Sequence, residues 1–95
     1  MFIVLLTFAE NKSKAGDFME GHKNWIKRGF EAGHFLLVGS LQPNRGGAIL
    51  AHNATLSEID AFVKEDPFVV EEIVTVEILE ITPAQAADEF KFLLD

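Results

Sequence analysis

The sequence predicts a single small α+β domain, and three observations lead to this expectation. The chain has 95 residues, 48% of them hydrophobic, which suits one domain. Four strand-length apolar runs are interspersed with two stretches of helical spacing. Turn residues separate most of these segments. A chain this short buries only about 60–65% of its unfolded surface when it folds alone, so we expect oligomerisation to add burial.

The first strand and the first helix follow directly from the pattern. Residues 2–8 form an apolar run, which predicts a buried strand. The next helix is expected from about Ser13 or Asp17 to Ala32, because Gly33 is the residue type that ends a helix in a left-handed conformation. Its apolar face is predicted to carry Phe18, Trp25, Ile26 and Phe30.

A hairpin with a long connection should follow. Residues 35–38 and 48–52 are predicted strands, and the stretch 39–47 between them is dense in turn residues.

The second helix and the last strand have equally local signals. Thr55 and Glu58 have the spacing of a capping box, and the helix they begin should end before residues 66–67. Residues 72–81 are rich in β-branched residues and predict the fourth strand. Thr82 followed by Pro83 repeats a helix-start signal, so we expect a short C-terminal helix over about 83–93.

The order strand, helix, strand, strand, helix, strand predicts a ferredoxin-like βαββαβ fold. The right-handed crossover rule then favours a four-stranded antiparallel sheet with both helices on one face. The other face would be bare, although the first two strands are apolar almost throughout. A second copy of the sheet is the simplest cover, so we expect a homodimer and leave a higher oligomer open.

Composition argues against several functions. The formal net charge of −7 disfavours nucleic acid as a partner, and no apolar run approaches the roughly 20 residues of a membrane-spanning helix. The chain has no cysteine, and its histidines lack the spacing of a helical metal site. No phosphate-binding loop occurs. We therefore expect a cytoplasmic protein without metal or cofactor.

Four short segments together resemble the YciI-like (YCII-related) family. They are His22 on the first helix, residues 32–39 leading into the second strand, Gly46-Gly47 before the third strand, and residues 65–68, Glu-Asp-Pro-Phe. The resemblance covers about residues 1–81. The whole chain, 1–95, is thus expected to be one YciI-like domain, with the C-terminal helix outside the family core.

The resemblance implies a dimeric α+β barrel whose active site holds a histidine and an aspartate. On this chain they are His22 and Asp66, the expected catalytic residues. The activities attributed to the family are lyase- or isomerase-like proton chemistry on small ring-derived compounds. The family commonly has proline where this chain has Ser40, a difference in the expected pocket wall.

Both expected catalytic residues also have a structural interpretation. His22 shares a helical stripe with apolar residues, where a histidine can simply bond a backbone carbonyl; functionally, an imidazole is a suitable general base near neutral pH. Asp66 precedes Pro67 and can cap a short helical turn. In the functional reading, Asp66 fixes the tautomer of His22 and stabilises its imidazolium form.

Four further residues are candidate substrate contacts, each with an alternative. Trp25 and Phe68 can line a pocket or belong to the core. Ser40 can offer a hydroxyl to substrate or bond its own loop. Arg45 can bind a carboxylate or remain in solvent.

We therefore expect a small cofactor-independent enzyme that moves a proton on a small organic substrate. The alternative is a non-catalytic ligand-binding or assembly domain, in which the same residues only pack and cap. A relative of the small barrel monooxygenases is a third possibility, and it would need a cavity for an aromatic substrate within each protomer.

Overall fold

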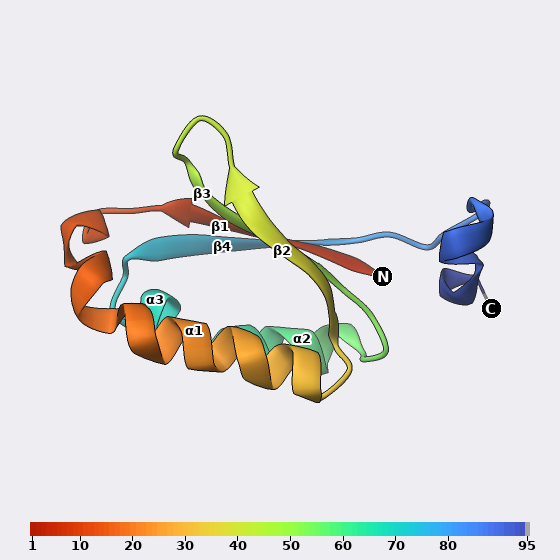
Figure 1. Cartoon of the computed structure of the whole chain (residues 1–95), viewed down its shortest axis with the longest axis horizontal. Coiled ribbons are helices and arrows are strands. Elements are labelled where there is room, and N and C mark those ends of the chain that lie inside the picture. The colour runs from red at the N-terminus through yellow and green to blue at the C-terminus, as the bar shows by residue number, and fades with distance from the viewer. Residues whose placement is uncertain (95) are drawn as a thin grey trace.

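A computed structural model describes residues 1–94 of the chain (Figure 1). Asp95, the last residue of the expected domain, lies outside the described residues. The elements are, in order, β1 (Phe2–Phe8), a 3₁₀ turn (Lys12–Lys14), α1 (Ala15–Glu31), β2 (Phe35–Leu41), β3 (Gly46–Ala51), α2 (Leu56–Val63), α3 (Pro67–Val70), β4 (Val74–Glu80) and a 3₁₀ helix (Asp88–Leu93).

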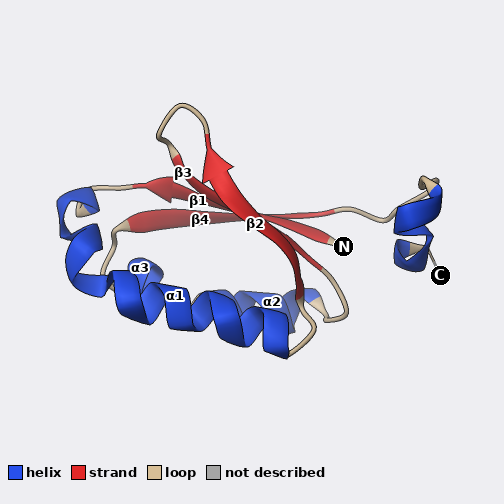
Figure 2. Ribbon diagram, viewed as in Figure 1, coloured by secondary structure: helices blue, strands red, loops and turns tan. Residues whose placement is uncertain are grey.

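The strands form one antiparallel sheet in the order β2-β3-β1-β4. The three helices α1, α2 and α3 lie on the same face of that sheet, which leaves the other face open (Figure 2). This arrangement confirms the α+β fold that the sequence predicts.

Strand β1 shows how one sheet can be apolar on both faces. Phe2, Val4 and Leu6 are buried beneath the helices, whereas the alternating Ile3 and Leu5 are only half-buried. The open face also carries large exposed side chains, with Leu37 on β2 and Leu79 on β4. The near-continuous hydrophobicity of β1 therefore supplies a core face and an uncovered apolar face.

Helix α1 is fixed on the sheet by an aromatic cluster. Trp25 is fully buried, meets Phe35 edge-on at 5.3 Å between ring centroids, and donates its indole N–H to the Phe62 carbonyl at 2.9 Å. Gly29 allows this close packing, since a Cβ atom there would lie 2.3 Å from the Phe35 ring. The core thus joins α1, β2 and α2.

The expected helix boundaries are confirmed by their capping geometry. Thr55 and Glu58 form the capping box of α2, with both reciprocal hydrogen bonds present. Gly33 follows α1 with a φ of +78°, the left-handed conformation expected there. Asp66 caps α3, and Pro67 occupies the first turn.

The hairpin is shorter than the turn-rich composition predicts. Strand β2 continues through Gly39 and Ser40 to Leu41, and β3 already begins at Gly46, so only residues 42–45 connect them. Gly39 and Ser40 pair with β3, and this pairing outweighs their preference for turns. Ser40 therefore lies in the sheet rather than in a loop.

The segment after β4 differs from the expected helix over about 83–93. The backbone is not helical from Ile81 to Ala87, and only the 3₁₀ helix Asp88–Leu93 follows, at a distance from the helix-covered body (Figure 1). Phe90 and Phe92 remain more than half exposed. A short helix is marginally stable by itself in water, and this one contacts the rest of the protomer through Phe92, whose ring centroid lies 5.6 Å from that of His52.

The helices of residues 1–94 include none with the length and apolar character needed to cross a bilayer.

We predict opposite effects for two glycine-to-alanine changes on α1. Gly29→Ala should destabilise the fold by about 1–3 kcal/mol, because the new methyl group collides with Phe35. Gly16→Ala, whose Cβ would meet nothing within 4 Å, should stabilise it by up to about 1 kcal/mol through helix propensity. Chemical denaturation measures both, and similar effects of the two changes would contradict the packing described for Gly29.

The capping box predicts a pH dependence of stability. The pKa of Glu58 lies below its ordinary 4.5, chiefly because the carboxylate accepts the backbone N–H of Thr55, and also through the Thr55 hydroxyl. The carboxylate therefore contributes its full stabilisation above pH 4.5, and the contribution is lost as the pH falls through the lowered value. The difference in unfolding midpoint between wild type and Glu58→Gln should narrow only in this acidic range. A constant difference across it would contradict the prediction.

Candidate functional site

The structure brings together two residues that lie 44 positions apart in the sequence. The Nδ1 atom of His22, on α1, lies 2.8 Å from Oδ1 of Asp66, the cap of α3. The His22 side chain is 15% exposed and Asp66 is fully buried. Asp66 is also the one buried charged residue among residues 1–94.

Local sequence explains why the two helices approach closely enough for this contact. Gly21, the residue before His22, has no side chain, and a Cβ there would lie only 3.0 Å from Cγ of Pro67. Pro67 in turn occupies the first turn of α3, directly after Asp66. A glycine on one helix and a proline on the other thus set the separation of the imidazole and the carboxylate.

Asp66 makes a helix-capping contact and a contact with His22 at the same time. Its Oδ1 atom accepts the backbone N–H of Phe68 at 3.0 Å, as a helix cap does, and the same atom faces His22. Because a carboxylate oxygen accepts hydrogen bonds, Nδ1 of His22 is the nitrogen that carries the proton, and Nε2 retains its lone pair when the ring is neutral. The second oxygen, Oδ2, is buried and has no hydrogen-bond partner among the described residues.

Aromatic stacking holds the imidazole ring in place. The Phe68 ring lies parallel to it, with 3.9 Å between centroids and 2° between planes. Trp25 stacks more distantly, at 5.9 Å and 22°. The ring orientation is therefore fixed by contacts with its plane and by the hydrogen bond at one edge.

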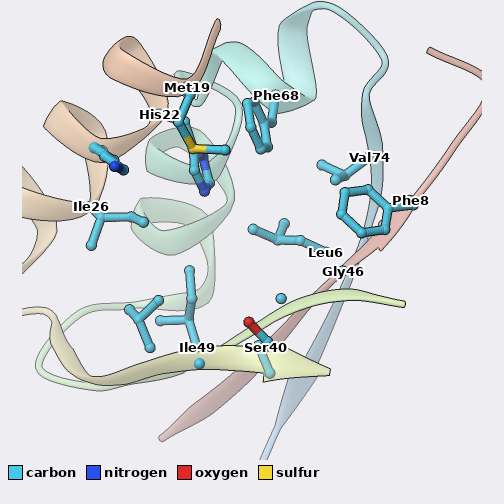
Figure 3. A pocket seen from close by; sticks show the side chains of 15 residues that line it. Leu6, Phe8, Met19, His22, Ile26, Ser40, Gly46, Ile49, Phe68 and Val74 are labelled. Carbon is cyan, nitrogen blue, oxygen red and sulfur yellow. The ribbon is translucent and has the colours of Figure 1, made fainter. Parts of the chain in front are cut away.

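His22 lines a cavity of about 390 Å³ between α1, α3 and the sheet (Figure 3). Most of the wall is apolar, and the floor includes glycine backbone from the β2–β3 hairpin. The lining residues are Leu6, Phe8, Met19, His22, Lys23, Ile26, Val38, Gly39, Ser40, Gly46, Gly47, Ala48, Ile49, Phe68 and Val74.

The candidate residues divide into two groups in the structure. His22, Ser40 and Phe68 line the cavity, and Asp66 lies behind His22, away from the lining. Trp25 is a core residue, and exposed Arg45 lies in the hairpin connection; neither lines the cavity.

Three lining residues of α1 are not among the site residues expected from the sequence. Met19, Lys23 and Ile26 share the helical face that presents His22 to the cavity. The available signal is helical spacing: Met19 and Ile26 lie three residues before and four residues after His22, and Lys23 lies four residues after Met19 and three before Ile26. Among residues 1–94, no three histidine, cysteine, aspartate or glutamate side chains cluster as a metal site would require.

The sequence assigns the chain to a protein family. A family model, the YCII-related domain, matches residues 1–84, so the chain belongs to the YCII-related family. The match confirms the resemblance and extends slightly beyond the expected end near residue 81. Residues 85–95 lie outside it.

A solved structure shares the fold. It is a 5-chloro-2-hydroxyhydroquinone dehydrochlorinase (TftG) from Burkholderia phenoliruptrix AC1100, in complex with 2,5-dihydroxybenzoquinone. The superposition has a TM-score of 0.68, covers 85% of this chain and 93% of the dehydrochlorinase chain, and has 12% sequence identity. A comparison with curated proteins finds no match.

The hydrogen-bond geometry predicts the tautomer of His22. In the neutral form of the ring, nitrogen NMR should show the proton on Nδ1 and a free lone pair on Nε2. Asp66→Ala should shift the population toward the Nε2-protonated form, and loss of the cap should cost about 1–2 kcal/mol in unfolding free energy. Nε2 protonation in the wild type would contradict the assignment.

Proposed function

We propose that the protein is a cofactor-independent enzyme in which His22 moves a proton on a small ring compound bound in the cavity. The observation that carries this proposal is the 2.8 Å contact between Nδ1 of His22 and buried Asp66, made by an imidazole that also lines the cavity. The contact leaves Nε2 as the nitrogen available to substrate. A base positioned in this way is worth about 10²–10⁴-fold in rate.

The proton transfer follows the division of roles between the two side chains. Nε2 of His22 accepts a proton from the substrate, and the electron pair of the broken bond enters the ring system. Either a leaving group departs with an electron pair, which is an elimination, or the imidazolium returns the proton to another atom, which is an isomerisation. Asp66 stabilises the imidazolium through the Nδ1 hydrogen bond and keeps its own charge.

The cavity fits a small, flat and largely apolar substrate. Its volume of about 390 Å³ is at the lower end of the range for ligand pockets, about 300–1,000 Å³. Phe8 and Phe68 supply aromatic wall. The dehydrochlorinase with the same fold acts on a hydroxylated ring and binds another, which supports a ring compound as substrate here.

The open face of the sheet supports a homodimer, the assembly we propose for the active protein in the cytoplasm. Exposed Leu37 and Leu79 flank the half-buried Ile3 and Leu5 on that face. Leaving these apolar side chains in water is costly, and a second copy of the same face would cover them.

One observation favours the alternative of a non-catalytic binding or assembly domain. Asp66 caps α3 through Phe68, so its burial has a structural explanation without any reaction. An enzyme should change a bound ring compound chemically, whereas a binding domain should leave it unchanged.

The test is proton exchange and elimination on a panel of chlorinated and unchlorinated hydroxyhydroquinones. We expect wild type to release chloride or to incorporate solvent deuterium into the ring, and His22→Gln to be slower by about 10²–10⁴-fold. Asp66→Asn should retain the shape of the site and lose part of the activity, because it cannot balance the imidazolium charge. His52→Gln, which changes a histidine outside the cavity, is the matched control.

Two results would overturn the enzymatic proposal. One is a wild type that binds these rings but neither exchanges protons nor releases chloride, which would favour the binding domain. The other is equal activity in His22→Gln and His52→Gln.

A further inference from the structure

The cavity carries a charge of the opposite sign to the protein. The chain has 15 acidic and 8 basic side chains and a formal net charge of −7. None of the acidic side chains lines the cavity, whose polar lining side chains are His22, Lys23 and Ser40. Lys23 is the lining residue with a permanent positive charge at neutral pH. An acidic protein thus presents a cationic pocket.

Lys23 is available to a ligand. It follows His22 on α1, lines the cavity and is exposed to solvent. The four ion pairs found in residues 1–94 do not include it. An ammonium group without a carboxylate partner, beside a largely apolar cavity, favours the binding of an anion.

Ser40 adds a second polar contact from the sheet. It lies on β2 and lines the same cavity as Lys23 on α1. Figure 3 shows its hydroxyl oxygen turned toward the interior of the pocket. A hydroxyl can donate a hydrogen bond to an anionic oxygen, so the sheet and the helix each supply one donor.

We infer that the cavity selects ring compounds that carry an anionic oxygen, which Lys23 and Ser40 bind. This inference rests on the proposed function only in taking the ligand to be a ring compound. The anionic oxygen holds one edge of the ring at the opening of the cavity, and the apolar wall receives the remainder of the ring. Lys23 and Ser40 are then specificity-determining residues, distinct from the proton-transfer role of His22.

The experiment compares charged and uncharged ligands of the same shape. The first pair is 2,5-dihydroxybenzoquinone, which is anionic at neutral pH because its hydroxyl groups are vinylogous carboxylic acids, and its uncharged 2,5-dimethoxy ether. The second pair is benzoate and benzamide. Calorimetric titration of the wild type should show binding of at least one anion that is about tenfold tighter than its neutral partner, the effect of one charge-assisted contact. The pair that shows the preference identifies the anion as a ring enolate or a carboxylate.

Variants assign the preference to particular side chains. Lys23→Met should remove most of the preference and leave the affinity for the neutral ligands almost unchanged. Lys27→Met is the matched control, because Lys27 lies one turn further along α1 and does not line the cavity. Ser40→Ala should reduce the preference by at least about threefold, because it removes one hydrogen-bond donor to the anionic oxygen. Since all three residues are exposed, the substitutions should leave the fold intact.

The inference is overturned if neither anion binds more tightly than its neutral partner, or if Lys23→Met and Lys27→Met have the same effect. These outcomes are separable from failure of the proposed function. His22→Gln should retain the preference for the anion. A charge preference without any turnover would remove the enzymatic proposal alone, and turnover without a charge preference would remove this inference alone.

Discussion

The candidate site depends on one hydrogen bond between two elements that share no local sequence. The contact between His22 and Asp66 joins the middle of α1 to the start of α3, and it accompanies the only burial of a charged residue among residues 1–94. Burial of a carboxylate is unfavourable unless partners compensate it. The imidazole and the Phe68 amide supply that compensation, so the same atoms that close the fold also orient the ring beside the cavity.

Most of the fold could be predicted because its signals are local. The capping box at Thr55, the left-handed Gly33 and the Asp66-Pro67 start of α3 each act within a few residues, and the structure has all three. The segment after β4 could not be predicted in this way. The helix-start signal at Thr82 and Pro83 is real as a local preference, but a helix also needs a surface to cover its apolar side, which the isolated sequence does not reveal.

The candidate site was predictable where a residue type is unusual for its position. A histidine on an apolar stripe and an aspartate before a proline are conspicuous, and the resemblance to the YCII-related family linked them. Trp25 and Arg45 are candidates by their chemistry alone, and the structure places Trp25 in the core and Arg45 in the hairpin connection. Lys23 is an ordinary surface lysine in sequence, and only the tertiary arrangement shows that it lines the cavity.

The geometry of the site depends on the close approach of Gly21 to Pro67. A hydrogen bond such as the 2.8 Å contact of His22 weakens once its atoms separate beyond about 3.2 Å. The distance between α1 and α3 can therefore increase by only a few tenths of an ångström before the contact weakens. A methyl group at position 21 would already press against the proline ring at 3.0 Å. The absence of a side chain at Gly21 therefore helps to set the distance between His22 and Asp66. A larger residue at this position would move the histidine without altering any polar group.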